Sequence, residues 1–197
     1  MRAPPRFILA SGSSRRRELL TAAGYVFDVI SPAIEEAENA HLTIREVTLL
    51  NATRKALAVV REMPRRVVVA ADTLVALQGE VIGKPRNMEA ARKMLRGLSG
   101  RAHHVCSAVC IARGRQILRS FTVLSEVRFR SLDAETINAY FRKIDPLDKA
   151  GAYAAQDDGG EIIERVGGSF TNVVGLPMEE TKRALNELGI RPVGLGN

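Results

Sequence analysis

The residues best suited to chemistry stand near the N-terminus, where the small residues Ser11 to Ser14 are followed by three arginines in a row. Gly12 lets backbone amides approach a ligand, and the serines offer hydroxyl donors. Cations in a first helical turn are mildly unfavourable, so Arg15 and Arg16 make more sense beside a bound anion. The stretch therefore predicts a phosphate site, although it is neither a Walker loop nor a dinucleotide fingerprint. A solvated helix start with Ser14 as N-cap is the alternative.

A second candidate is Asp72, which follows five apolar residues and is predicted to end the most buried strand. A buried carboxylate is costly without a partner, and a metal ion or a catalytic water would be one. Glu35 and Glu36, in the loop after the second predicted strand, could complete a hard-oxygen site for Mg²⁺ beside phosphates. Lys84 and Lys149 are point charges suited to phosphate oxygens. Taken singly, residues of these types are more often surface or capping groups.

The two cysteines, Cys106 and Cys110, stand four residues apart in a run with strand character. Their side chains then share a face at a separation of roughly 13 Å, which is too far for a disulfide. Zinc would need further ligands, and the nearby His103 and His104 are adjacent, hence on opposite faces of a strand. We expect two buried, reduced thiols.

Composition sets the class of protein. The 197 residues are 46% hydrophobic and 26% charged, which favours one globular domain over residues 1–197 and excludes a disordered or fibrous chain. No apolar run approaches the roughly 20 residues that cross a bilayer, and the N-terminal apolar stretch is too short for a signal peptide. We therefore expect a cytoplasmic protein without a membrane partner.

The formal net charge of +7 favours an anionic partner. Nucleic acid and a small polyphosphate both qualify. Aromatic residues make up only 5% of the chain and the arginines are scattered in pairs, which weighs against nucleic acid.

Apolar β-rich runs alternate with helical patterns along the first half of the chain. Thr43 and Glu46 form a capping-box pattern at the start of a long helix, which should turn Val47, Leu50, Leu57 and Val60 toward the core. Consecutive valines before Asp72 are typical of a central strand covered on both faces. The predicted strands cover residues 6–10, 25–31 and 65–77, and the predicted helices cover 14–24, 43–62 and 88–98.

In the second half, two long strands, 103–112 and 116–130, are joined by a short hairpin connection. A helix capped by Asp133, a strand over 161–166 and a final helix from Pro177 follow. Residues 143–160 form a turn-rich loop, and such long loops are usually functional. The whole pattern predicts an α/β fold with a mixed sheet, whose ligands gather at the carboxyl ends of strands, where Ser11 to Arg16 lie.

Several blocks stand in order along the chain: ILASGSSRRRELL, AADTLV with GEVIGKP, LSGRAHHVCSAV, and DKAGAYAAQ with GSFTNVVGLP. Together they resemble the Maf family of nucleoside triphosphate pyrophosphatases, named for septum-formation inhibition. The resemblance spans residues 7–188 and is more specific than any single motif. It implies a central twisted sheet flanked by helices, with two lobes around a deep cleft, related to the inosine triphosphate pyrophosphatases. It also implies a divalent cation (Mg²⁺, or Mn²⁺ or Co²⁺) and a homodimer.

The resemblance also implies roles for individual residues. Asp72 matches the family's general base or metal-linked acid, and Glu36 would join it as a metal ligand. Substrate-binding roles follow for Ser11, Arg15, Arg16, Lys55, Thr73, Lys84 and Gln156; among these, Arg15, Thr73 and Gln156 match positions associated with substrate choice. The ADT and KAGAYAAQ motifs resemble the branch that acts on dTTP and UTP, with 5-methyl-UTP and pseudo-UTP left open, rather than the 7-methyl-GTP branch.

One position departs from the family pattern, in which a proline usually stands where this chain has Ser14. Proline would pre-set the backbone for the first helical turn, so the phosphate loop is expected to be looser in this chain.

The resulting hypothesis is hydrolysis of a nucleoside triphosphate between its α and β phosphates, giving the monophosphate and pyrophosphate. Asp72 would activate a water for attack on the α-phosphorus, beside a metal ion that neutralises charge. The alternative is a non-catalytic module that senses nucleotides in the same cleft, or binds nucleic acid or a division partner on an exposed face. Two acids beside several cations weigh against it, because binding alone does not need them.

Overall fold

The computed structural model describes residues 7–37, 41–156 and 159–193. Its centre is a seven-stranded mixed sheet in the order β2-β1-β3-β5-β6-β7, with β4 paired to β3. β1 (Phe7–Ala10) is parallel to β2 (Phe27–Ile30) and to β3 (Val68–Leu77). The antiparallel strands are β4 (Glu80–Ile82), β5 (Ala102–Arg113), β6 (Gln116–Phe129) and β7 (Ile163–Gly167). The predicted α/β class, mixed sheet and central position of β3 are confirmed.

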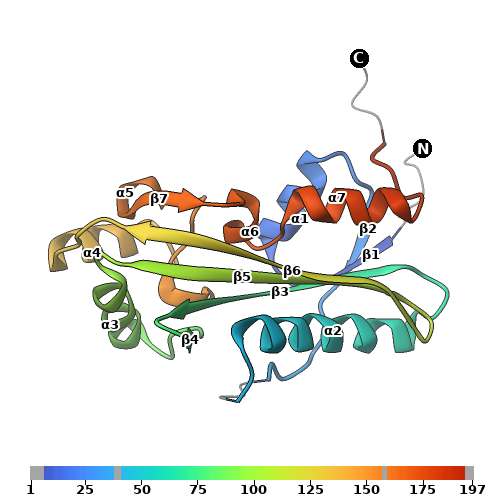
Figure 1. Ribbon diagram of the computed structural model, residues 1–197, viewed down its shortest axis with the longest axis horizontal. Helices are drawn as coiled ribbons and strands as arrows, with labels where there is room; N and C mark the ends of the chain where they lie inside the picture. The colour runs from blue at the N-terminus through green and yellow to red at the C-terminus, as the bar shows by residue number, and fades with distance from the viewer. Residues whose placement is uncertain (1–6, 38–40, 157–158, 194–197) are drawn as a thin grey trace.

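Helices lie on both sides of this sheet (Figure 1). α2 (Ile44–Glu62) runs along one face, whereas α1 (Ser14–Ala22), α6 (Phe170–Val174) and α7 (Met178–Glu187) lie along the other. The end of the sheet away from the β5–β6 hairpin carries α3 (Met88–Leu98) and α4 (Ala134–Phe141), with α5 (Gly159–Ile162) beside β7. A 3₁₀ turn, η1 (Ala150–Ala152), lies in the long loop after α4. Among the described residues, no helix combines the length and apolar character needed to span a bilayer.

The period of two along β3 divides the core between these layers. Val68 and Ala70 pack with the α2 side, while Val69 and Ala71 pack with residues of α1 and α7. Further along the same strand, Val75 joins a third cluster with the residues of α3 and α4. The sheet therefore has one apolar core near the α3–α4 end and two, on opposite faces, at its other end.

The capping box at the start of α2 is confirmed, since the Thr43 side chain accepts from the Glu46 amide and Glu46 reaches back to the Thr43 amide. The predicted inner face of this helix was partly wrong. Val47 and Val60 are buried, but Leu50 is 39% exposed and Leu57 only half-buried. A second set of α2 residues is buried instead, and it includes three polar ones: Thr48, Asn51, Ala52, Lys55, Ala56 and Val59. α2 presents this face to the sheet because Asn51 and Lys55 both contact Asp72, a buried residue of β3.

Other boundaries also differ from the sequence prediction. β3 begins at Val68, three residues later than predicted, and ends at Leu77 as predicted for residues 65–77, so Asp72 lies within the strand and not at the end where it was expected. Ser13, not Ser14, is the N-cap of α1, and its side chain makes no capping hydrogen bond. The short elements β4, η1, α5 and α6 were not predicted, and α5 occupies the start of the predicted strand 161–166.

Both cysteines are free and buried, as predicted. Burial raises the pKa of the Cys106 and Cys110 thiols, which disfavours the reactive thiolate.

Candidate active site

The candidate site lies where β1 ends before its parallel neighbour β3 does. β1 stops at Ala10, which pairs with Ala70, whereas β3 runs on past Asp72 to Leu77. The chain therefore leaves the sheet at Ser11, and among the described residues this edge of β3 has no partner strand between Ala70, which pairs with β1, and Val75, which pairs with β4. A crevice beyond the carboxyl end of a parallel strand is the usual ligand position in such sheets.

A cleft of about 440 Å³ occupies this position. It is lined both by the β1–α1 segment and by residues 148–150 and 153–155 of the long loop, so its walls come from both ends of the sheet. Most predicted site residues line it together: Ser11, Arg15, Arg16, Glu36, Lys55, Asp72, Thr73, Lys84 and Lys149. Glu35 and Gln156 do not line it; both are exposed, and the Gln156 amide donates to Glu18 on α1 at 3.2 Å.

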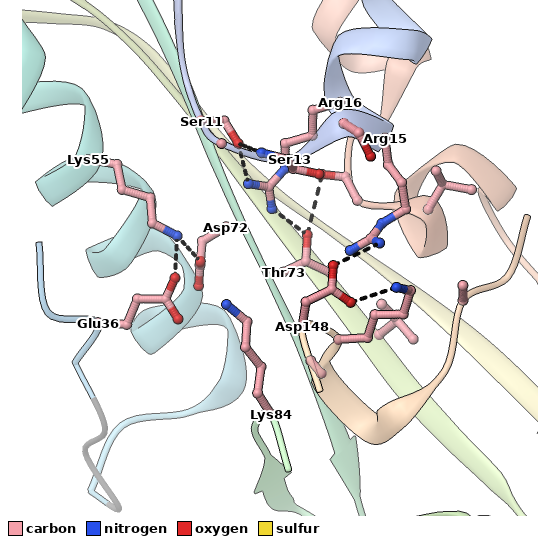
Figure 2. Close-up of a pocket in the computed structure, with 18 of the residues that line it drawn as sticks. Ser11, Ser13, Arg15, Arg16, Glu36, Lys55, Asp72, Thr73, Lys84 and Asp148 are labelled. Carbon is pink, nitrogen blue, oxygen red and sulfur yellow. Dashed lines mark hydrogen bonds and ion pairs between the residues drawn. The ribbon is translucent and has the colours of Figure 1, made fainter. Parts of the chain in front are cut away.

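Arg16 is a buried cation of the cleft wall, with 9% of its surface exposed. Its guanidinium donates to the carbonyl of Gly175 at 2.9 Å, to the Ser11 hydroxyl at 3.0 Å and to the Thr73 hydroxyl at 3.1 Å (Figure 2). Burial lowers the pKa of Arg16, and the Asp72 charge opposes this, but an arginine stays protonated in proteins. Among the described residues its hydrogen-bond partners are all neutral, which leaves a buried positive charge at the cleft.

On the α2 side of the cleft, a lysine links two carboxylates. The Lys55 ammonium lies 2.5 Å from Oδ1 of Asp72 and 2.7 Å from Oε1 of Glu36 (Figure 2). Asn51, one helical turn before Lys55, donates to Asp72 Oδ2 at 3.3 Å. Asp72 is 3% exposed, so the helix supplies both the charge and the hydrogen bond that a buried carboxylate needs.

The charge state of Glu36 reflects the same arrangement. Burial alone would raise its pKa, but the hydrogen bond and charge of Lys55, assisted by the charges of Lys84 and Arg16, outweigh this and lower the pKa. Glu36 is therefore ionised at neutral pH. The Lys84 side chain points into the cleft from the turn after β4 (Figure 2).

The opposite wall carries a looser charge cluster. Asp148 lies 2.5 Å from the Lys149 ammonium and 3.9 Å from the Arg15 guanidinium. Its side chain is 59% exposed, whereas that of Lys149 is 8% exposed. Asp148 thus lies between two cations that a phosphate could also bind.

The two carboxylates that face Lys55 fit a divalent cation only in part. Glu36 and Asp72 approach the same ammonium, and oxygen ligands are those that Mg²⁺ prefers. Among the described residues there is no group of three or more acidic, His or Cys side chains that could hold a metal alone. Two carboxylates with phosphate oxygens and water do match the usual Mg²⁺ environment.

Sequence reasoning missed several residues of the site. Asn51 stands four residues before Lys55, and that spacing on one helix face was the available signal. Asp148 could have been noticed beside Lys149. Ser107 and Asn172, buried behind Thr73, carry no local signal, because their partners are far away in the sequence.

Comparison with known proteins gives a consistent match. The family described as Maf-like protein matches residues 6–188. A dTTP/UTP pyrophosphatase of Akkermansia muciniphila is 48% identical over 187 residues, which cover 95% of this chain and 98% of the relative. A protein of the same name from Salmonella typhimurium is 45% identical, with 90% of each chain covered. Among solved structures, a nucleoside-triphosphatase / dITP/XTP pyrophosphatase of Mycobacterium abscessus is 16% identical, with a TM-score of 0.43 over 92% of this chain and 96% of that one.

Proposed function

Because the chain belongs to the Maf family, we propose that it is a nucleoside triphosphate pyrophosphatase that hydrolyses dTTP and UTP to the monophosphate and pyrophosphate. The names of the relatives support this substrate choice. The observation that carries the proposal is the buried, charged Arg16, whose described partners are neutral, in the same cleft as the Asp72–Lys55–Glu36 cluster. A polyanion is the ligand whose charge suits such a cleft.

Cations on both walls bind the triphosphate in this proposal. Arg16 and the Ser11–Ser13 loop lie on the β1–α1 side, and Lys84 and Lys149 lie across the cleft. Arg15 would exchange its long ion pair with Asp148 for a phosphate oxygen, since an exposed pair at 3.9 Å contributes little. Fixed positive groups around the phosphates stabilise charge that develops as the anhydride bond breaks.

Glu36 and Asp72 would hold a divalent cation together with the phosphate oxygens. Such an ion, Mg²⁺ being the first candidate, supplies neutralisation of phosphate charge and polarisation of the bond that breaks. Lys55 would then move from between the carboxylates or share them with the ion.

Asp72 is the proposed general base. Its Oδ1 and Oδ2 contact Lys55 and Asn51, which fix the carboxylate at the floor of the cleft. From there it would accept a proton from the water that attacks the α-phosphorus, in line with the departing pyrophosphate.

Base choice is proposed to depend on Arg15, Thr73 and Gln156. A site that hydrogen-bonds a base leaves buried polar groups unpaired when the wrong base enters, and so discriminates strongly. Gln156 is exposed and bound to Glu18, so this role requires it to leave that partner when substrate binds. A homodimer remains a prediction, which sedimentation of the purified protein tests.

The test is pyrophosphate release by purified protein with Mg²⁺ against dTTP, UTP, CTP, GTP, ATP and 7-methyl-GTP. We expect turnover of dTTP and UTP, with pyrophosphate rather than inorganic phosphate as product. If no nucleotide of the panel releases pyrophosphate, with Mn²⁺ and Co²⁺ also tried, the proposal is overturned in favour of a binding module. A nucleic-acid module would further show affinity that falls by orders of magnitude between 50 and 200 mM salt.

A further inference from the structure

We infer that Ser107 is a positioning residue for the anion site: its buried hydroxyl, held by Asn172, orients Thr73 and through it the guanidinium of Arg16. The inference rests on the proposed function in that it takes Arg16 as a ligand of the phosphates. It concerns residues that do not line the cleft themselves, because Ser107 and Asn172 are both 0% exposed.

Ser107 lies directly opposite Thr73 in the pairing of β5 with β3. The two hydroxyl oxygens are 2.8 Å apart, and Thr73 in turn accepts from Arg16 at 3.1 Å. The contact is thus a cross-strand pair of hydroxyls, one of which reaches the cleft while the other stays behind it.

The direction of these hydrogen bonds is fixed at the buried end. Ser107 Oγ lies 2.8 Å from the Asn172 carbonyl oxygen, which can only accept, so the one hydroxyl proton of Ser107 points there. Thr73 is then the donor toward Ser107, at the shorter of its two acceptor contacts, since the Gly175 carbonyl lies 3.3 Å from the same hydroxyl. The result is a chain of hydrogen bonds from Arg16 through Thr73 and Ser107 to Asn172, whose members support one another.

Asn172 is itself held on several sides. Its Oδ1 accepts from the Ser107 amide at 3.1 Å, and its Nδ2 donates to the Val105 carbonyl at 3.0 Å and to the Ser125 hydroxyl at 2.9 Å. Asn172 belongs to α6, after which the Gly175 carbonyl accepts from Arg16 Nε at 2.9 Å. The segment from Asn172 to Gly175 therefore contacts the guanidinium directly, as well as through Ser107 and Thr73.

This arrangement decides which N–H groups of Arg16 remain for a ligand. The described contacts use one N–H each on Nε, Nη1 and Nη2, so one N–H on Nη1 and one on Nη2 are left. Loss of the Ser107 hydroxyl would leave Thr73 with only the longer contact to the Gly175 carbonyl at 3.3 Å, so that Thr73 fixes the plane of the guanidinium less firmly. A small misorientation of a positioning group weakens binding and turnover far more than it weakens the fold.

Ser125 offers a matched control for Ser107. It is also a buried serine, 1% exposed, which accepts from Asn172 and donates to the carbonyl of Ser169, but it does not contact Thr73. Ser107→Ala and Ser125→Ala should therefore lower the thermal midpoint by comparable amounts. Only Ser107→Ala should change the anion site.

The experiment is calorimetric titration of each variant with inorganic tripolyphosphate, which needs no turnover. We expect Kd to rise on the order of tenfold in Ser107→Ala and to stay within about twofold in Ser125→Ala. In an Arg16→Lys background the Ser107→Ala change should add less than about twofold, because the two residues act through one chain. Ser107→Cys, with a poorer hydrogen-bonding group of similar size, should give an intermediate Kd and serves if Ser107→Ala does not fold.

Equal weakening by the two serine variants, or an Arg16→Lys background that leaves the Ser107 effect intact, would overturn the inference. So would wild-type protein that binds no tripolyphosphate. If the wild type binds tripolyphosphate but releases no pyrophosphate from any nucleotide, the proposed function fails while the positioning role of Ser107 stands.

Discussion

The ammonium of Lys55 lies 2.5 Å from Oδ1 of Asp72, with the two side chains only 11% and 4% exposed. Water hardly reaches the Asp72 carboxylate at that depth, so α2 supplies the compensating positive charge through Lys55. The same ammonium contacts Glu36 at 2.7 Å, which makes Lys55 the group on which two acids of the cleft depend.

Lys55→Met should therefore impair both stability and function. Leaving Asp72 buried without its partner is expected to lower the free energy of unfolding by about 3 kcal/mol. The pKa of Glu36, which Lys55 holds down, should rise, so the acid limb of the pH–rate profile should move to higher pH. Urea unfolding and a pH series of pyrophosphate release measure the two effects.

Lys143→Met is the control for this change, because Lys143 pairs with Glu161 at an exposed position. Lys143→Met should lower the free energy of unfolding by no more than about 1 kcal/mol and leave the pH–rate profile unchanged. An unmoved acid limb in Lys55→Met would show that Glu36 does not limit turnover.

Asp72→Asn keeps the size of the side chain but removes its charge and its basicity. We expect it to fold and to lose turnover by at least about 100-fold, the effect typical of a missing general base. Asp28→Asn, which alters an exposed acid on β2 paired with Arg66, should leave turnover unchanged. Initial rates of pyrophosphate release, with thermal melts as a check on folding, decide the matter, and retained turnover would remove Asp72 from the chemistry.

How far the sequence predicts this site depends on where each residue finds its partner. The capping box of α2 and the bounds of α3 were predictable, because short-range hydrogen bonds and turn residues set them. The inner face of α2 was not, because its rotation follows the contact between Lys55 and Asp72, residues far apart in the chain. An apolar-period argument assigns Leu50 to the core, and the polar cluster overrides it.

Residues of the cleft divide in the same way. Ser11, Arg16 and Asp72 stand out because of local features, a small-residue loop before a helix and a carboxylate after an apolar run. Ser107 and Asn172 are an unremarkable serine and asparagine until the pairing of β3 with β5 brings them behind Thr73. Only the register of the sheet distinguishes them from other buried polar residues.

The departure at Ser14 gives a prediction about stability. Ser14 is the first residue of α1, where a proline costs no hydrogen bond, and Ser13 has φ −69° and ψ 122°, a conformation that suits a residue before proline. Ser14→Pro should raise the free energy of unfolding by about 0.4–1 kcal/mol by restricting the unfolded chain. Thermal or urea unfolding measures it against Ser14→Ala, and a destabilised Ser14→Pro would mean that the loop needs backbone freedom at this position.

His103 supplies the last prediction, which concerns stability at acid pH. Its imidazole is 1% exposed and lies 2.8 Å from the hydroxyl of Tyr153, a residue of the cleft wall. Burial, with a smaller contribution from His104, lowers the pKa of His103 to about 4. The unfolded chain, with a histidine pKa near 6.5, therefore binds more protons between these pH values. The stabilising contribution of the neutral ring is complete above about pH 6.5 and is lost as the pH falls toward 4.

His103→Gln retains a hydrogen-bonding group for Tyr153 but cannot titrate. The difference in free energy of unfolding between wild type and this variant should shrink on the order of 3 kcal/mol from pH 7.5 to pH 4, as determined by urea unfolding at each pH. His104→Gln, at the exposed neighbouring position, should leave the wild-type pH dependence nearly unchanged. Parallel curves for wild type and His103→Gln would mean that the buried ring takes up its proton without opening the wall of the cleft.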